Sequence, residues 1–267
     1  MNEHQLHVIN GTAFHAAVEG EGTPLVLLHG GYSNLAVWDW HVETFAKEFR
    51  VLRYDQRGYG KTEAAKAPFS YYQDLKDMMD HFGIQKASLV GSSFGGSAAI
   101  DFALAYPDRV EKLVLAAPSV NGTKYPLRLT WQGIKDFMRV KKHGIQRAAE
   151  HFMDDAFWQY TIPQNEAGRK KFKELYLANE AFYQEKPSLH RPLKPYAIGR
   201  LSEIGHPVLI VEAGRDLAFN QAICRQAHRS IKGSKLVRLE KCGHYPHLES
   251  PAEFLDTVLP FLRFYLI

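Results

Sequence analysis

Six short runs of the sequence are largely apolar without regular alternation, and they constrain the fold more than any other feature. They cover 24–29, 51–54, 87–90, 112–117, 207–211 and 235–239. Strands that helices cover on both faces of a parallel sheet have this character. Between the runs lie segments of helical length and period, at 35–49, 70–82, 93–106, 220–231 and 251–264. This alternation predicts an α/β fold with a mostly parallel, doubly wound sheet.

The N-terminal residues predict an antiparallel hairpin at one edge of this sheet. Residues 5–9 and 12–18 are strand-like, and Asn10-Gly11 separates them. An Asn-Gly pair favours the tight turn that joins two antiparallel strands. Together with the six apolar runs, the hairpin gives an expected sheet of eight strands.

One long interval interrupts the alternation of strands and helices. From about Val120 to Ala197 there is no convincing buried strand. Helical spacing occurs there instead, at Ile134-Phe137-Met138 and at Phe172-Leu175-Tyr176-Asn179. We therefore expect an α/β core domain made of residues 1–119 and 201–267, and a helical cap of residues 120–200 inserted after the sixth strand.

The composition is that of a globular protein and excludes disorder and fibrous structure. Of 267 residues, 45% are hydrophobic and 23% charged, and the formal net charge of +4 is too small to indicate nucleic acid binding. No apolar run reaches the ~18 residues that span a bilayer, and Met1–Gln5 do not begin a secretion signal. We expect a cytoplasmic protein with no membrane partner, in which Cys224 and Cys242 are reduced.

The positive charge is concentrated in the interval that we assign to the cap. Residues 119–200 contain 15 Lys and Arg against 8 Asp and Glu, whereas the rest of the chain is slightly acidic. A solvated helical face explains this excess most simply. Attraction of an anionic substrate is the alternative.

The turn at Gly91-Ser92-Ser93-Phe94-Gly95 carries the strongest chemical signal. It joins a buried strand to a helix and fits the pattern Gly-x-Ser-x-Gly, in which the central serine is exposed at the top of a sheet. Centring the pattern on Ser92 would put side chains where glycines are needed. Ser93 is therefore the candidate nucleophile, and an ordinary strand-to-helix turn of small residues is the alternative.

A serine hydroxyl becomes a good nucleophile when a base removes its proton and a third group orients that base. His244 follows the last predicted strand and is the preferred base; His247 is the local rival, and no third ligand with metal-site spacing accompanies this pair. Asp216, on the exit loop of a buried strand, is the preferred carboxylate, because Glu212 is still within the strand. The other histidines are interpreted as surface or satisfied core residues.

The developing negative charge on the substrate oxygen needs preorganised donors. We expect the backbone N–H groups of Gly31 and Phe94 to form this oxyanion hole, with Tyr32 as the alternative first donor. His29, just before these glycines, is interpreted as a structural hydrogen-bonding residue. The loop that begins at Asp55 lacks phosphate-loop spacing and is interpreted as a structural loop near the site.

Together, these motifs resemble the α/β-hydrolase fold superfamily over nearly the whole chain. The motifs are His29-Gly30-Gly31, Asp55-x-Arg57-Gly58-Tyr59-Gly60, Gly91-x-Ser93-x-Gly95-Gly96, Gly214-x-Asp216 and Gly243-His244. The resemblance implies that Ser93, Asp216 and His244 are nucleophile, acid and base, that the pocket lies between core and cap, and that no cofactor is used.

Differences between this sequence and the motifs of some subgroups of the superfamily reduce the number of activities that the chain could have. A serine nucleophile argues against dehalogenases and epoxide hydrolases, Tyr32 after the two glycines argues against proline-specific peptidases, and secreted lipases carry a signal that is absent here. Esterases, lactonases, carbon–carbon bond hydrolases, thioesterases and cofactor-free haloperoxidases remain.

We predict a serine hydrolase of a small carboxylic ester or related acyl compound, working through an acyl-enzyme without metal or cofactor. One alternative is a carbon–carbon bond hydrolase of an anionic dienone or diketo acid, which the basic cap favours. The other is a ligand-sensing protein that turns over its ligand very slowly. The sequence assigns no substrate-binding residue and no oligomeric state.

Overall fold

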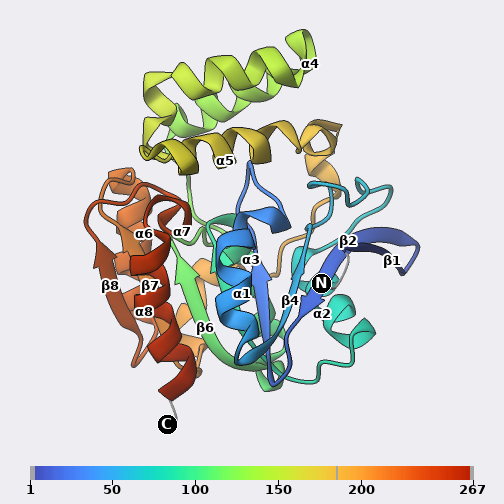
Figure 1. Ribbon diagram of the computed structural model, residues 1–267, viewed down its shortest axis with the longest axis vertical. Helices are drawn as coiled ribbons and strands as arrows, with labels where there is room; N and C mark the ends of the chain where they lie inside the picture. Colours follow the sequence, from blue (N-terminus) through green and yellow to red (C-terminus); the bar gives the residue numbers. More distant parts are fainter. Residues whose placement is uncertain (1–3, 185, 265–267) are drawn as a thin grey trace.

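The computed structural model describes residues 4–184 and 186–264, and its centre is one eight-stranded sheet (Figure 1). The strands are β1 (Gln5–Ile9), β2 (Thr12–Glu19), β3 (Thr23–Leu28), β4 (Phe49–Tyr54), β5 (Ala87–Ser92), β6 (Val110–Ala116), β7 (Val208–Ala213) and β8 (Lys235–Leu239). Their order across the sheet is β1-β2-β4-β3-β5-β6-β7-β8. Among these strands, β2 pairs antiparallel with β1 and β4, and the other pairs are parallel. The predicted sheet with its N-terminal hairpin is confirmed.

The hairpin turn has the backbone that its sequence requires. Asn10 and Gly11 have φ of 48° and 77°, and the register pairs Ile9 with Thr12 directly across the turn. Two consecutive left-handed residues define the tight turn that Asn-Gly favours. The turn therefore sets which residues of β1 and β2 face each other.

The described residues form eight α-helices, and the five at the predicted helical segments match them within a few residues, with one exception. The eight are α1 (Asp39–Ala46), α2 (Tyr71–His81), α3 (Phe94–Ala105), α4 (Leu127–Asp154), α5 (Glu166–Leu177), α6 (Ala218–Ser230), α7 (Pro246–Glu249) and α8 (Pro251–Phe264). Short 3-10 helices are η1 (Leu35–Trp38), η2 (Pro107–Arg109), η3 (Ala156–Tyr160), η4 (Glu180–Gln184), η5 (Pro187–Leu189), η6 (Ala197–Gly199) and η7 (Leu201–Glu203).

The exception is the single helix predicted over 35–49, which is wrong at both ends. Its first turn is η1, which the Asn34 side chain caps by accepting from the Ala36 N–H at 3.0 Å. At its other end, Phe49 is the first residue of β4 and pairs with Thr23 of β3. Phe49 is buried in β4, and it would also be buried on the inner face of a helix. Its apolar character therefore could not distinguish a helix from a strand at this position.

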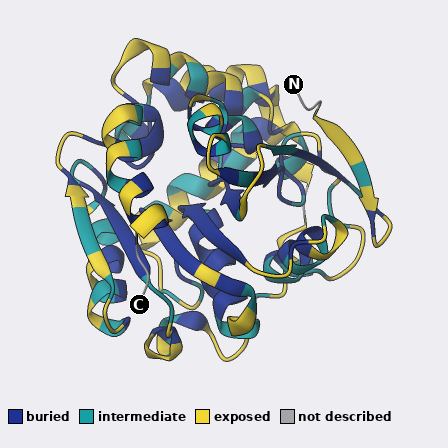
Figure 2. Cartoon of the chain, turned by 60° about the horizontal axis from the view of Figure 1, so that its bottom comes forward, coloured by how far each residue is buried: buried dark blue, intermediate teal, exposed yellow. Residues whose placement is uncertain are grey.

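Neighbouring residues of the central strands enter two separate hydrophobic cores. In β3, Leu25 and Leu27 pack on the side of α1 and α8, whereas Val26 and Leu28 pack on the side of α2, α3 and α6. The same alternation holds in β6 and β7. Figure 2 shows the buried central strands and the exposed outer faces of the surrounding helices. Burial on both faces of the sheet thus explains the apolar runs of β3 to β7. The prediction is wrong for 235–239, because β8 is an edge strand in which only Leu239 is buried.

Between β6 and β7 the described residues form helices and connecting loops, with one isolated bridge between Phe69 and His190. Helix α4 is the outermost element here, and α5 lies between it and the sheet in Figure 1. Gly144 interrupts α4 with a φ of 78°. The predicted helical insertion is therefore present, whereas its division from the core at residues 120 and 200 stays a prediction, and residues 1–3, 185 and 265–267 lie outside the described residues.

A buried carboxylate connects α4 to α5 and η4. Asp136 is almost fully buried and accepts hydrogen bonds from the hydroxyls of Tyr176 at 2.8 Å and Tyr183 at 3.0 Å. Burial raises the pKa of this carboxyl group to about 6. By contrast Ile134 and Met138, which show the predicted helical spacing, are exposed to solvent.

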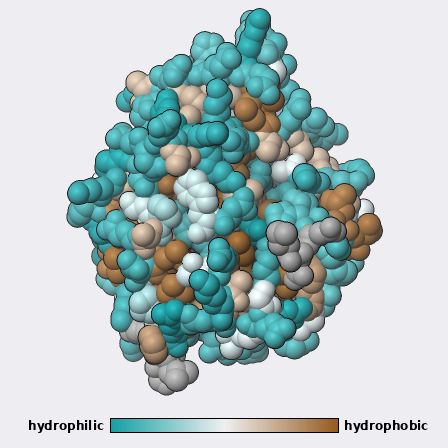
Figure 3. All heavy atoms as spheres, in the orientation of Figure 1, coloured by the Kyte–Doolittle hydropathy of each residue, from teal (hydrophilic) through white to brown (hydrophobic). Residues whose placement is uncertain are grey.

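The face of the molecule in Figure 3 is mostly hydrophilic, with apolar side chains in separate patches. Among the described helices, none is both long enough and apolar enough to cross a membrane.

Truncating a side chain of the inner core should destabilise the fold. Phe102 of α3 is fully buried, so Phe102→Ala should lower the free energy of unfolding by about 3–5 kcal/mol, measured by urea denaturation. Phe264→Ala removes an exposed ring and is the matched control, with a change within about 0.5 kcal/mol. Equal effects of the two substitutions would contradict this description of the core.

Candidate active site

The turn between β5 and α3 holds Ser93 in a strained backbone conformation. Its φ is 48° and its ψ is −112°, a combination that side-chain-bearing residues rarely adopt. Backbone hydrogen bonds hold the residue on both sides: the Ser93 N–H donates to the Ala116 carbonyl, and the Gly96 N–H donates to the Ser93 carbonyl, each at 2.9 Å. The sheet and the helix together therefore fix the direction of the Ser93 side chain.

Gly91 and Gly95, on either side of Ser93, must be glycines because other backbone atoms pass very close to them. A Cβ atom at Gly91 would lie 2.6 Å from the Gly95 carbonyl oxygen, and one at Gly95 would lie 2.4 Å from the Leu28 carbonyl oxygen. Neither backbone atom can move without shifting a strand or a helix. The spacing Gly-x-Ser-x-Gly is thus a steric requirement of this turn.

Three side chains from three different loops form one chain of hydrogen bonds. His244 Nε2 lies 2.7 Å from Ser93 Oγ, and His244 Nδ1 lies 2.6 Å from Asp216 Oδ2. The carboxylate can only accept, so Nδ1 carries the proton and the unprotonated Nε2 accepts from the serine hydroxyl. The structure brings together all three residues that the sequence singled out.

Asp216 is further held by a residue that sequence reasoning missed. Its second oxygen accepts from the Leu217 N–H at 2.7 Å and from Asn220 Nδ2 at 2.6 Å. Asn220 follows Asp216 by four residues and lies in the first turn of α6, so the available signal was a polar pair at the start of a predicted helix. These bonds fix the carboxylate in the orientation that faces His244.

The loop that carries His244 contacts the helical insertion and is hydrogen-bonded to it. The His244 N–H donates to the Tyr160 carbonyl at 2.8 Å, and a Cβ atom at Gly243 would lie 2.5 Å from the same oxygen. Tyr160 belongs to η3, far from His244 in the sequence. No local pattern could have indicated this contact, because a backbone carbonyl has no sequence signature.

The glycine bend after β3 is held by buried side chains on both sides. His29 Nδ1 donates to the Gly30 carbonyl at 2.8 Å, while His29 Nε2 accepts from the Gln56 N–H at 2.9 Å. Burial lowers the pKa of His29, which keeps the ring neutral in this arrangement. On the other side, the Tyr245 hydroxyl donates to the Gly31 carbonyl. Tyr245 was also missed, although it directly follows His244.

A cavity of about 440 Å³ opens above Ser93 and His244. Its wall is rich in aromatic rings, with no Lys, Arg, Asp or Glu among the lining residues. The lining residues are Gly31, Tyr32, Tyr59, Ser93, Phe94, Ser119, Tyr125, Leu129, Thr130, Gly133, Trp158, Tyr160, Thr161, Phe182, Asn220, His244 and Tyr245. Eight of these 17 residues, from Tyr125 to Phe182, come from the helical insertion. The excess of cations in residues 119–200 is therefore not directed into this cavity.

A smaller aromatic cavity adjoins the first one. It measures about 290 Å³ and shares Tyr59, Phe94 and Phe182 with the larger cavity. The loop that begins at Asp55 supplies Tyr59 to both cavities, and the Asp55 carboxylate accepts from the backbone N–H groups of Leu35 and Lys61. This loop is structural and lies beside the site, as the sequence indicated.

Sequence and structure both match a known family. Its sequence profile, that of the alpha/beta hydrolase family, matches residues 25–257. The chain belongs to the alpha/beta hydrolase family. A 2-hydroxy-6-oxononadienedioate/2-hydroxy-6-oxononatrienedioate hydrolase from Comamonas testosteroni is 35% identical over 91% of this chain and 88% of its own length. A hydrolase of the same name from Burkholderia vietnamiensis is 29% identical over 96% of this chain and 93% of its own.

Solved structures of the same fold include other activities. The enol-lactonase from Burkholderia xenovorans LB400 superposes with a TM-score of 0.79 at 24% identity, over 96% of this chain and 99% of its own. Carboxylesterase CesB from Bacillus subtilis gives a TM-score of 0.81 at 21% identity, over 100% of this chain and 93% of its own. At these identities the likeness shows the shared fold alone.

His247, the rival base in this hydrolase, is turned away from Ser93 into the core. Its ring stacks on Trp38 at 4.6 Å, and neither His247 nor the neighbouring His41 has a hydrogen-bond partner in the described structure. The interpretation of the remaining histidines as surface or satisfied core residues is thus wrong for His41, which packs among aromatic rings instead. Among the described residues no group of three or more His, Cys, Asp or Glu is placed to hold a metal.

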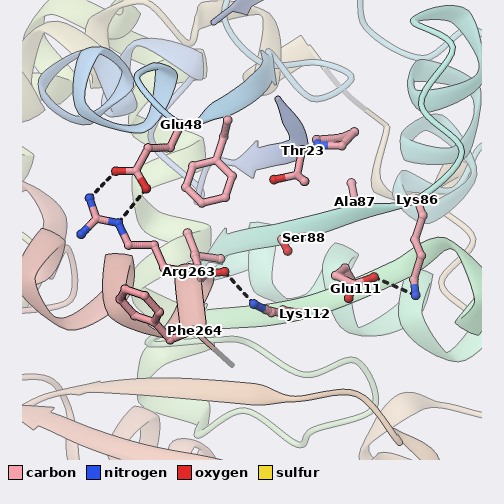
Figure 4. Close-up of a pocket in the computed structure, with 12 residues that line it drawn as sticks. Thr23, Glu48, Lys86, Ala87, Ser88, Glu111, Lys112, Arg263 and Phe264 are labelled. Carbon is pink, nitrogen blue, oxygen red and sulfur yellow. Dashed lines mark hydrogen bonds and ion pairs between the residues drawn. The ribbon is translucent and has the colours of Figure 1, made fainter. Parts of the chain in front are cut away.

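A larger cavity, of about 620 Å³, lies away from Ser93 at the other ends of the strands (Figure 4). Its charged side chains are satisfied within the described residues: Lys112 donates to the Leu262 carbonyl, Lys86 pairs with Glu111, and Arg263 pairs with Glu48. It has no nucleophile and base in contact. The cavity above Ser93, where a hydroxyl and an imidazole are in contact, is therefore the candidate active site.

The buried His41 should make the fold sensitive to acid. Burial lowers the pKa of His41 from 6.5 to about 4. Between these two pH values His41 is protonated in the unfolded chain but stays neutral in the folded chain. Stability is therefore lost as the pH falls from 6.5 towards 4. The neutral His41 should lower the free energy of unfolding at pH 5 by about 2 kcal/mol relative to pH 7.

His41→Phe should remove that part of the pH dependence, measured by urea denaturation at pH 7 and pH 5. His143→Phe, which replaces an exposed histidine of α4, is the control and should keep the wild-type slope. An unchanged slope in His41→Phe would contradict the assignment.

Proposed function

We propose that this chain is a serine hydrolase of neutral carboxylic esters or related acyl compounds. The observation that carries the proposal is the unbroken chain of hydrogen bonds from Asp216 through His244 to Ser93. A serine hydroxyl, a neutral imidazole and a carboxylate in this order form the arrangement that activates serine for acyl transfer. The family assignment agrees with a hydrolytic reaction.

In the first half of the reaction, Ser93 Oγ attacks the substrate carbonyl carbon while its proton moves to His244 Nε2. The Asp216 carboxylate stabilises the resulting imidazolium through the bond to Nδ1. The tetrahedral intermediate then breaks the bond to the leaving alcohol, which takes the proton from His244. Ser93 is left as an acyl ester.

In the second half, a water molecule attacks this ester while His244 Nε2 accepts a proton from the water. When the second tetrahedral intermediate collapses, the bond to Ser93 Oγ breaks and the serine recovers its proton from His244. The carboxylic acid leaves, and the enzyme returns to its starting state. These steps need no cofactor or metal.

We assign the N–H groups of Gly31 and Phe94 to the oxyanion hole. Phe94 is the first residue of α3, so its N–H has no partner within the helix. The Gly30 carbonyl is held by buried His29, and in a trans peptide the Gly31 N–H points to the opposite side. By the same rule, the Gly31 carbonyl accepts from the Tyr245 hydroxyl, so the Tyr32 N–H points away from that hydroxyl. The Tyr245 hydroxyl and Ser93 lie together against Gly30, which supports Gly31 over Tyr32 as the donor.

The uncharged, aromatic wall of the cavity supports a neutral substrate. A dianionic substrate would lose its hydration there without gaining a cationic partner from the lining residues. The second candidate is hydrolysis of a carbon–carbon bond in a dienone or diketo acid. The relative that is 35% identical favours it, because its name gives such a substrate. The ester is our first choice because of the lining residues.

Removing the Ser93 hydroxyl should greatly slow ester hydrolysis, whereas removing the hydroxyl of the neighbouring Ser92 should not. Ser93→Ala and Asp216→Asn should each lower kcat on p-nitrophenyl acetate by a factor on the order of 10³–10⁴. Ser92→Ala is the matched control: Ser92 is fully buried beside Ser93, its hydroxyl has no partner in the described structure, and we expect near wild-type kcat.

Full activity of Ser93→Ala would contradict the mechanism. The slow ligand-sensing alternative is decided by the wild-type protein, because steady turnover above roughly 1 s⁻¹ on any ester excludes it.

A cation introduced into the cavity wall should change the preference for substrate charge. Wild type should have a higher kcat/KM on a neutral p-nitrophenyl ester than on the monoanionic hemisuccinate ester or on an anionic diketo acid. Thr130→Lys places an ammonium at the lining of the cavity and should shift the ratio towards the anionic ester by roughly fivefold. Thr130→Gln is the control of similar length without charge.

If wild type instead cleaves the diketo acid faster than any ester, the carbon–carbon reaction replaces our first choice.

A further inference from the structure

The first half of α4 carries a stripe of exposed apolar side chains. Leu127, Trp131, Ile134 and Met138 are 88%, 58%, 48% and 59% exposed. Their spacing of four, three and four residues places them on one face of a helix. Of the ten large apolar residues that are exposed in the described chain, five lie between Tyr125 and Met138. We call these four residues of α4 the outer stripe.

The opposite face of the same helix accounts for its packing in the fold. Leu129 and Gly133 line the cavity above Ser93, while Asp136 and Val140 are buried. These residues lie about half a turn away from the outer stripe. The attachment of α4 to the rest of the protein therefore does not require the outer stripe, and burial does not explain its apolar residues.

The side chains that flank the outer stripe are basic. Arg128, Lys135, Lys141 and Lys142 are exposed. Between residues 124 and 149 the one acidic residue is Asp136, which is buried and points away. Within the described structure these four cations form no ion pair with a carboxylate. An apolar stripe with cations on its flanks is the pattern of a helix that lies in the surface of an anionic membrane.

We propose that the outer stripe docks onto an anionic lipid bilayer, with Trp131 at the level of the headgroups. The charges select this occupant over a second copy of the chain, because a two-fold contact through α4 would bring two clusters of cations together. The helix would lie on the membrane surface and not cross it. This surface goes beyond the proposed reaction, and it differs from the absence of a membrane partner that we expected from the sequence.

Docking would place the cavity next to the lipid. The outer stripe and the cavity-lining residues Leu129 and Gly133 lie on opposite sides of one helix, whose diameter is about 10 Å. An apolar ester dissolved in the bilayer would then have a short path to Ser93. This consequence rests on the proposed function, whereas the docking itself does not.

Vesicle flotation tests the docking directly. Full-length protein is mixed with vesicles of phosphatidylcholine alone, or of phosphatidylcholine with phosphatidylglycerol as the minor anionic component. We expect binding to the anionic vesicles, weakening as NaCl is added, and little binding to phosphatidylcholine alone. Ser93→Ala should bind as wild type does, so failure of the catalytic mechanism would leave this result intact.

Variants of α4 identify the surface that binds. Ile134→Ser/Met138→Ser should weaken binding to the anionic vesicles by roughly tenfold or more, because it removes two apolar anchors. Lys135→Glu/Lys142→Glu should weaken it by at least as much. The matched control is Leu6→Ser/Val8→Ser, which removes two exposed apolar residues of β1 and should bind as wild type does. Hydrolysis of a water-soluble ester should be unchanged in all of them.

Tryptophan fluorescence reports the contact itself. Wild type should show a blue-shifted emission on anionic vesicles, and Trp131→Phe should lose this shift while it still binds. The proposal is overturned if no vesicle binds, or if the α4 variants bind as wild type does. It is also overturned if sedimentation shows a dimer that Ile134→Ser/Met138→Ser dissociates and no vesicle binds, because the occupant is then a second copy.

Discussion

The close approach of α3 to the strands beneath it is the constraint on which the site depends. Gly91 and Gly95 leave no room for a Cβ atom, and this closeness lets the sheet hold Ser93 at a φ of 48°. Strain of this kind costs on the order of 1–3 kcal/mol and persists because the surrounding structure over-determines it. The two hydrophobic cores on either side of the sheet supply that support.

The candidate active site is built from both the sheet region and the helical insertion. The core supplies Ser93, Asp216 and the glycine bend, whereas the insertion supplies the Tyr160 carbonyl that holds the His244 loop and much of the cavity wall. A shift of α4 and η3 would therefore alter the base as well as the substrate pocket. Helix α4 faces the cavity on one side and carries the outer stripe on the other, so a surface contact and the site share one element.

Several parts of this protein could be predicted from short patterns. Five central strands, β3 to β7, follow from apolar runs because they are buried on both faces of the sheet, and the hairpin of β1 and β2 follows from Asn10-Gly11. The helix predicted over 35–49 failed because Phe49 is buried in either assignment. His41 was misjudged because a sequence does not show whether a buried ring finds a partner.

The sequence by itself determined the sheet, the turn at Ser93 and the choice of Asp216 and His244, since each depends on local sterics or on a residue's place at the end of a strand. Tertiary structure alone decided what those residues touch. Asn220 holds the Asp216 carboxylate, and the Tyr160 carbonyl, from a distant segment, holds the backbone of His244. It also decided where the cations of residues 119–200 lie: none lines the cavity above Ser93, and Lys186 lines the smaller cavity beside it. The amino-acid composition gives the number of charged side chains, but the packing of each helix sets where those side chains point.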